Sequence, residues 1–459
     1  MRDPEGHEPT GIRVPWARSD RRIPRTALRP LQHFLDTEAS GGIVLLAAAV
    51  VALVWANSPW AASYDRVWHT ELTIGIGDWS ITEDVRHWIN DALMAIFFFV
   101  VGLEIKRELV VGELRDPRSA ALPVFAALGG MVAPALIYVA INAGGPGADG
   151  WGIPVATDIA FAVGLIAIAG RGLPSSVRLL LLTLAIVDDI GAILIIAIFY
   201  SSGIGWWALG AAGALLVTIK LLDRLHVRWM PVYVVLGAGV WLAFFESGVH
   251  ATIAGVALGL LTPARPFQDP DAVSKEARRA TAETADERQP PDEDVPVWLY
   301  LSSLTREAVA PLDRLEHSLH MWTSFAIMPL FALANAGIEI SAGTLGDAAT
   351  NRTTIGIVAG LVIGKLAGVT GVAWLATKLR IARLPNGVSW PHVMAVGAVA
   401  GIGFTVSLFI AGLAFSEPDV LEPAKLGVFA ASVIAGVVGT IILRSIRRRD
   451  ARPQEPPAR

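Results

Sequence analysis

Two adjacent aspartates lie in the middle of a long apolar stretch of this 459-residue chain. Asp188 and Asp189 occur in the segment LAIVDDIGAILIIA, which offers almost no other polar side chain. Hard cations prefer oxygen ligands, and two neighbouring carboxylates removed from water tend to retain a proton. A cation that enters such a site favours the ionised form and displaces the proton. The pair is therefore a candidate site at which Na+ and protons compete.

Two further charged residues lie near the middle of apolar stretches. They are Asp158, in WGIPVATDIAFAVG, and Lys365, in IGKLAGV. An ionisable side chain at the depth of a bilayer costs upward of about 2.5 kcal/mol, and it is a functional candidate by default. Lys365 could also form a structural ion pair with Asp188, and this alternative stays open.

The stretch that holds Asp158 is expected to be a broken helix. Pro154 removes a helical donor and disfavours helix just before it, so backbone near Thr157 and Asp158 should be exposed. The glycine-rich segment GAVAGIGFTVS, 397–407, is a counterpart in the other half of the chain. Two interrupted segments in corresponding halves point to a transporter site. We expect Asp158 to offset the positive helix ends that face each other there, and Lys365 the negative ones.

A second group of charged residues lies at the end of another apolar stretch and before a later one. It consists of Glu104, Arg107, Glu108, Glu316, His317 and His320. Histidine titrates between pH 5 and 8, so this group could sense cytoplasmic pH. The alternative is ordinary charge at a membrane interface. His250 and Asp91 are interpreted as structural polar groups.

Long apolar helices must position these residues. The chain is 53% hydrophobic and 17% charged, with a mean hydropathy of +0.53, whereas a soluble domain is about one quarter charged. A helix needs about 20 mostly apolar residues to cross a bilayer. Twelve such segments are expected, at 39–56, 89–108, 119–141, 152–169, 176–200, 205–222, 231–246, 248–262, 320–338, 353–376, 393–415 and 423–444. There is no cysteine, which excludes disulfides and thiolate sites.

The distribution of positive charge predicts the orientation. With the N-terminus inside, 32 of the 37 Lys and Arg residues fall in inside segments, and cytoplasmic loops collect such residues. Both termini are therefore expected in the cytoplasm. The predicted order is a basic tail, eight helices, a charged cytoplasmic linker, four helices and a second basic tail, at 1–38, 39–262, 263–312, 313–446 and 447–459. Within the linker, 264–296 is too polar to bury an apolar face and is expected to be disordered or marginal.

The outer loop contains a candidate β-hairpin at about 70–82. The segment LTIGIGDWSI alternates apolar and polar residues in part and carries Gly77-Asp78 near its centre. An ordinary loop is the alternative. Because an isolated hairpin is marginal in water, we expect it to pair with another surface, such as a second copy of the chain.

The sequence resembles the NhaA family of sodium/proton antiporters from about residue 33 to residue 446. The segments that carry this resemblance are EASGGI, WINDALMAIFFFVVGLEIKREL, ATDIAF, LAIVDDIGAI, SGVHATIAG, LEHSLHMW, PLFALANAG, IGKLAGV and GIGFTVSLFIA. The resemblance implies an all-α polytopic membrane protein with about twelve transmembrane helices, inverted repeats and two broken helices that cross at mid-membrane.

The resemblance also implies roles for individual positions. Asp189 would bind the cation and carry a proton, while Asp188 would do likewise or pair with Lys365. Thr157 and Asp158 would serve the crossing. The Glu104 to His320 group would form the region that responds to pH, and the outer hairpin would mediate dimerisation. The long basic tail, the long linker and Leu366 after the lysine depart from the family pattern.

The predicted activity is secondary active antiport that expels Na+ or Li+ in exchange for H+, electrogenic and regulated by pH. The expected setting is a bacterial inner membrane, as a homodimer, with no cofactor and no nucleic acid. An intramembrane aspartyl protease is one rival, but its GIGD-like signature at 75–78 lies away from the buried aspartates. A passive cation channel is another, although two broken helices suit alternating access better.

Overall fold

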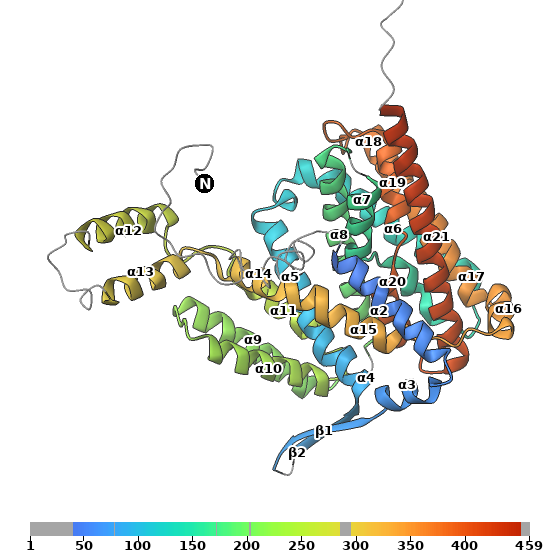
Figure 1. The fold of residues 1–459 in the computed structure, drawn as a ribbon, viewed down its shortest axis with the longest axis horizontal. Helices are drawn as coiled ribbons and strands as arrows, with labels where there is room; N and C mark the ends of the chain where they lie inside the picture. Colours follow the sequence, from blue (N-terminus) through green and yellow to red (C-terminus); the bar gives the residue numbers. More distant parts are fainter. Residues whose placement is uncertain (1–39, 78, 171, 202, 285–294, 451–459) are drawn as a thin grey trace, which may run out of the picture.

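The computed structural model describes residues 40–450, except 78, 171, 202 and 285–294. The tail predicted over 1–38, most of the tail predicted over 447–459 and a part of the linker lie outside the described residues. The described part is almost entirely helical, with one two-stranded sheet (Figure 1).

The helices of the first part of the chain are α2 (Ser40–Ala56), α3 (Ala61–Trp68), α4 (Val85–Trp88), α5 (Met94–Val110), α6 (Pro117–Asn142), α7 (Ile159–Ala169), α8 (Ser175–Phe199), α9 (Trp206–Arg224), α10 (Met230–Glu246) and α11 (Thr252–Leu261). Those that follow are α12 (Pro270–Thr284), α13 (Val295–Glu307), α14 (Pro311–Trp322), α15 (Met328–Asn335), α16 (Ala342–Thr350), α17 (Arg352–Val358), α18 (Lys365–Lys378), α19 (Trp390–Val399), α20 (Phe404–Ala414) and α21 (Pro418–Asp450). Short 3-10 and π-helical turns adjoin them at η3 (Ile89–Leu93), η4 (Glu113–Arg115), η5 (Ala148–Val155), η6 (Thr323–Ile327) and η7 (Ala359–Gly364).

Among the described residues, seven helical stretches are long and apolar enough to cross a membrane. They are Val85–Val110, Pro117–Asn142, Ala148–Ala169, Ser175–Phe199, Trp206–Arg224, Arg352–Lys378 and Pro418–Arg448. Two bent pairs raise this number to nine, namely α2 with α3, bent by 117°, and α19 with α20, bent by 47°. Helix covers each of the twelve predicted segments, but the count of twelve spans stays a prediction.

Glycine lets the central helices approach each other closely. A Cβ on Gly129 of α6 would strike the carbonyl oxygen of Gly368 on α18, and the reverse is also true. Gly102 of α5 and Gly259 of α11 also bring two helix backbones together, since a Cβ on Gly102 would strike the carbonyl oxygen of Val256 on α11. Small residues at such contacts bring membrane helices together when burial of apolar surface cannot. Because α6 also packs against α8, this contact places α18 close to the helix that carries the paired aspartates.

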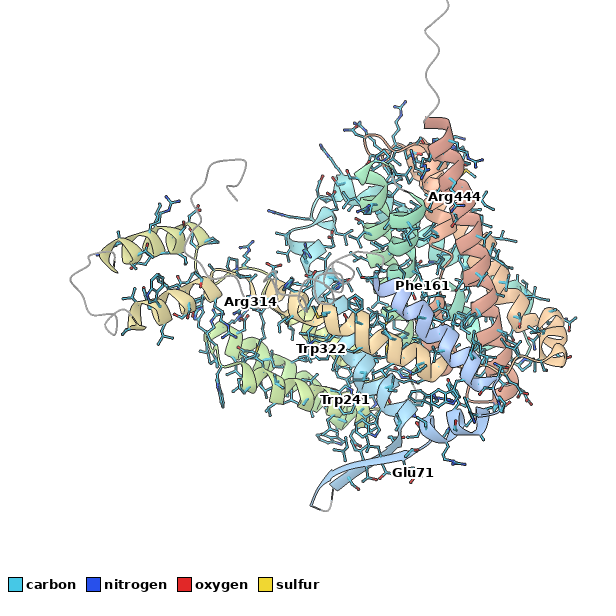
Figure 2. The ribbon with its side chains drawn as sticks, viewed as in Figure 1. Glu71, Phe161, Trp241, Arg314, Trp322 and Arg444 are labelled. Atoms are coloured by element: carbon cyan, nitrogen blue, oxygen red, sulfur yellow. The ribbon has the colours of Figure 1, made fainter. Side chains whose placement is uncertain are left out.

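The outer faces of the helices are apolar. Trp207 is 95% exposed and Val235 is 71% exposed, on the α9–α10 pair at the lower left of Figure 1. Such exposure suits a lipid environment and not water. Trp241 of α10, labelled in Figure 2, donates its Nε1 hydrogen to the carbonyl oxygen of Asp91 at 3.1 Å, which ties this pair to the turn before α5.

The predicted hairpin is confirmed. Strands β1 (Glu71–Ile76) and β2 (Trp79–Asp84) pair in antiparallel fashion, and they project from the body beside α3 and α4 (Figure 1). Gly77 has a φ of +64°, a left-handed conformation that glycine adopts without strain.

The linker differs in part from its expectation, because helix α12 occupies 270–284 of the stretch 264–296 that was expected to be disordered or marginal, and α13 begins at its end. They pack against each other and extend away from the body at the left of Figure 1. Val273 of α12 and Leu301 of α13 are both 6% exposed. Of the two alternatives, disorder is wrong for 270–284, because α12 packs against α13, whose apolar residues lie beyond 264–296.

Candidate functional site

Two interrupted helices meet at their breaks, and this meeting point is called the crossing below. The turn η5 ends at Val155, and the backbone is extended through Ala156 and Asp158 before α7 begins. On the other side, residues 400–403 separate α19 from α20. The backbone N–H of Asp158 donates to the carbonyl oxygen of Ile402 at 2.7 Å, so the two breaks pair directly. The break predicted from Pro154 therefore exists, and it contacts the predicted glycine-rich counterpart.

Asp158 joins the N-termini of both α7 and α20. Its Oδ1 accepts the backbone N–H of Phe161 at 3.1 Å, and its Oδ2 accepts the backbone N–H of Thr405 at 3.0 Å. The Thr405 hydroxyl donates to the same Oδ2 at 2.5 Å. Phe161 is labelled near the middle of the body in Figure 2. A carboxylate here satisfies unpaired amides at the N-termini of both helices, and a negative charge at a helix N-terminus is favourable.

Asp188 is fully buried in an ion pair. Its Oδ2 accepts hydrogen bonds from the Lys365 Nζ at 2.5 Å and from the Thr157 hydroxyl at 2.7 Å. Lys365 is itself 0% exposed and follows the π-helical turn η7, which interrupts its helix. π-Helical turns are frequent at functional sites. We expected Lys365 to offset the negative ends of helices. Its contact in the structure is instead with the carboxylate of Asp188.

Thr157 connects the ion pair to the crossing. Its hydroxyl lies 2.9 Å from the carbonyl oxygen of Ala400 as well as 2.7 Å from Asp188 Oδ2. A hydroxyl has one hydrogen, so Thr157 can donate fully to only one of these two acceptors at a time. Asp188 Oδ1 is buried and has no hydrogen-bond partner among the described residues. A buried oxygen without a partner leaves capacity for a ligand.

Asp189 has a different environment from its neighbour. It is 5% exposed, and the hydrogen bonds and ion pairs of the described residues include none to its side chain. The carboxylates of Glu104, Asp188 and Asp158 are close enough to repel its charge. A buried carboxylate among other carboxylates attracts a cation, and the nearby Lys365 ammonium group opposes that attraction.

A resident metal ion does not fit this arrangement. Within the part of the chain that the structure describes, no three His, Cys, Asp or Glu side chains are grouped so that they could hold one. A cation at Asp189 would need hydroxyl, backbone carbonyl or water oxygens to complete its shell.

The cytoplasmic group is brought together only in part. Arg107 donates to Glu316 Oε1 at 2.6 Å, which links α5 to α14. Glu108 Oε2 accepts the backbone N–H of Glu113 at 3.0 Å. His317 and His320 are exposed on α14, and the contacts of the described residues give neither of them a partner.

Sequence reasoning missed some contacts and anticipated others. Thr405 was not selected, although the hydroxyl beside glycines in GIGFTVS was an available signal. No signal indicated that Asn90 and Asn335 would bond through their side-chain amides, at 2.8 Å. The structural interpretation of His250 agrees with the structure, since its Nε2 lies 2.7 Å from the carbonyl oxygen of Tyr200.

Apolar membrane-length helices, two paired breaks and buried carboxylates together define a multi-pass transporter of small ions. A family model described as Na+/H+ antiporter 1 matches residues 32–443. The chain therefore belongs to the Na+/H+ antiporter 1 family, and exchange of Na+ for H+ is the activity of that family.

Curated relatives agree with this assignment. "Na(+)/H(+) antiporter NhaA 2" of Sorangium cellulosum is 49% identical over 432 residues, which cover 93% of this chain and 92% of the relative. "Na(+)/H(+) antiporter NhaA" of Rhodopirellula baltica is 48% identical, covering 91% and 94%. That of Rhizobium meliloti is 47% identical, covering 90% and 94%.

Proposed function

We propose that this chain expels Na+ or Li+ in exchange for H+ through Asp189, with Asp188 as its neighbour in the site. The observation that carries this proposal is the asymmetry of the two carboxylates. Asp188 is held by Lys365 and Thr157, whereas Asp189 is buried beside it without a described partner. A carboxylate without a fixed partner can bind a proton and a cation in turn.

The exchange rests on competition for the same oxygens. A proton on Asp189 removes the charge that attracts a cation, and a bound cation stabilises the ionised carboxylate. The unpartnered Asp188 Oδ1 and the Thr157 hydroxyl oxygen are candidates to complete a Na+ shell. Li+ prefers the same class of ligand. Neither ion can bind while the proton remains, so the two fluxes are coupled.

Alternating access would use the crossing of the two broken helices. The extended residues there are joined by a few hydrogen bonds, such as that from Asp158 N to Ile402 O, and not by continuous helix. Such a segment can rearrange with less loss of backbone bonding than an unbroken helix. Asp158 would keep the helix ends neutralised during the change.

Exchange of more than one proton for each cation would make transport electrogenic. The second proton could be carried by Asp188 or by the Lys365 ammonium group, and both alternatives stay open. One net charge is driven by about 2.3 kcal/mol per 100 mV of membrane potential. Inward movement of protons then expels cytoplasmic Na+.

Regulation by pH is proposed for the surface where α5 meets α14. The Arg107–Glu316 pair connects these helices, and the two exposed histidines His317 and His320 lie on the same helix as Glu316. Protonation of a histidine there would change the charge around the pair. Glu104 connects this surface with Asp189, because its carboxylate acts on that of Asp189.

The membrane setting and oligomeric state are proposed from the sequence and the hairpin. The distribution of Lys and Arg supports cytoplasmic termini in a bacterial inner membrane. Leu72 and Ile74 of β1 are 47% and 51% exposed, and a two-stranded sheet has two open edges. Pairing with the hairpin of a second copy would cover both features.

The test is proton flux in proteoliposomes with an acidic interior, after addition of Na+, Li+ or K+. We expect Na+ and Li+ to trigger proton efflux in the wild type. Asp189→Asn removes the titrating oxygen, so its flux should fall to the protein-free background. Asp347→Asn, an exposed carboxylate on α16, is the matched control and should behave as wild type. Full flux in Asp189→Asn would refute the assignment of the site.

A further inference from the structure

A surface pocket lies where α18 ends and the chain turns back into α19. Its volume is about 620 Å³, and Trp374, Lys378, Arg383 and Trp390 are among its lining residues. Helix α19, which follows this turn, packs against α21, and the end of α21 lies at the top of Figure 1. Arg444 of α21, labelled in Figure 2, lies at the same end of the molecule.

The pocket carries positive charge. Lys378 and Arg383 supply two cations, and no carboxylate lines it. In the sequence, no acidic residue occurs between Asp347 and Glu417. The Lys378 Nζ lies 4.7 Å from the centre of the Trp374 ring, so the indole face holds the ammonium group in place by a cation–π contact. The pocket is therefore complementary to an anion.

The turn that closes the pocket adds a third cation. The N–H of Ile381 donates to the Ala376 carbonyl oxygen and that of Arg380 to the Thr377 carbonyl oxygen, both at 3.0 Å. This pattern ends a helix with a residue in the left-handed conformation, where glycine is favoured. Here the residue is Arg380, with a φ of +60°. A strained arginine in place of glycine puts positive charge beside the pocket.

The pocket also borders a surface that suits lipid. Leu375, Leu379 and Ile381 are 47%, 59% and 51% exposed beside it. Trp374 lies in the last turns of a membrane-length helix and Trp390 begins the next apolar pair. Tryptophan is enriched at the membrane–water interface because its ring packs against the apolar side while its N–H faces the polar side.

We propose that this pocket binds the phosphate headgroup of an anionic phospholipid, in the leaflet at this end of α18. The two lining cations hold the phosphate, and the exposed apolar side chains receive the acyl chains. The bound lipid braces the helix that begins with Lys365, 13 residues or about 20 Å from Lys378 along its axis. The proposal does not depend on the exchange mechanism, because its readout is lipid binding.

The test is native mass spectrometry of the full chain in detergent, titrated with phosphatidylglycerol or with phosphatidylcholine of the same acyl chains. Each Lys or Arg side chain near an anionic membrane contributes to the binding free energy. We therefore expect R383Q to weaken phosphatidylglycerol binding about fivefold and K378Q/R383Q to weaken it about 30-fold. Phosphatidylcholine should bind weakly to all variants. K275Q/R278Q, which removes two exposed cations from α12, should bind as wild type.

Several outcomes would overturn the proposal. Equal phosphatidylglycerol affinity in K378Q/R383Q and in the α12 control would show that these two cations do not form a lipid site. Equal binding of phosphatidylcholine would show that only the apolar surface matters. Displacement of phosphatidylglycerol by inorganic phosphate at an equal concentration would assign the pocket to the free anion. Recovery of binding in K378R/R383K, with an unchanged unfolding midpoint, supports the proposal and excludes misfolding as the cause.

Discussion

Two ion pairs of similar length lie in very different parts of the molecule. Lys365 and Asp188 meet at 2.5 Å with both side chains 0% exposed, whereas Arg107 and Glu316 meet at 2.6 Å with side chains 53% and 16% exposed. A buried charge without a partner is very costly, so the first pair must stay together or change its protonation. Water and salt screen the second pair, which contributes little to stability. Similar contact lengths therefore occur in different environments, one buried and one exposed to water.

The buried pair should give the largest effect when one partner is removed. We expect Lys365→Met to lower stability by about 3–5 kcal/mol, because Asp188 then lacks its counter-ion. The double variant Lys365→Met/Asp188→Leu should recover much of this loss. Unfolding midpoints in detergent would measure both. If the double variant is as unstable as Lys365→Met, the loss of stability does not come from leaving Asp188 without its counter-ion. Residual exchange in a folded double variant would assign Asp188 a structural role only.

The helix crossing should respond less strongly than the ion pair. Thr405→Val removes the hydroxyl that donates to Asp158 but retains the backbone N–H that donates to the same oxygen. Loss of a hydrogen bond to a charged group costs about 1.5–3 kcal/mol. Thr440→Val is the matched control, since its hydroxyl donates only within α21, to the Gly436 carbonyl oxygen. Equal unfolding midpoints for the two variants would show that Thr405 adds nothing to the crossing.

The exposed pair should affect the pH profile and not stability. In a double-mutant cycle, Arg107→Gln and Glu316→Gln should show a coupling of at most about 1 kcal/mol. Their maximal exchange should be retained while the pH of half-maximal activity moves, and His320→Ala should also move it. Asp223→Asn, which breaks another exposed pair with Lys220, is the control. An unchanged pH profile in all three variants would show that the charged residues of α5 and α14 are ordinary interfacial charges with no role in pH response.

The smallest effect is expected at an exposed helix cap. The backbone N–H of Arg118 and the Ser119 side chain lower the pKa of Asp116, which caps α6. A carboxyl group with a lowered pKa stabilises the fold above its unfolded value of about 3.9. That contribution is lost as the pH falls through the folded value. We expect Asp116→Asn to lower the unfolding midpoint slightly at pH 7, and the difference from wild type to shrink in acid. A constant difference at all pH values would contradict this.

The sequence alone determined the features that depend on local composition. Apolar segments of membrane length, the break near Pro154, the hairpin around Gly77 and the four buried charges were all readable, because each depends on residues near it in the chain. The linker shows the limit of that reasoning. Helix α12 buries Val273 against α13, so its stability depends on a partner outside the stretch that was judged too polar to fold.

Only the tertiary structure decided how the buried charges are distributed. Asp188 and Lys365 are 177 residues apart, and Asp158 and Thr405 are 247 apart. Adjacent residues on a helix point in directions about 100° apart. That difference turns Asp188 toward Lys365 and leaves Asp189 without a described partner. Nothing in the local sequence distinguishes the two carboxylates, because the distinction comes from contacts that exist only once distant helices have packed.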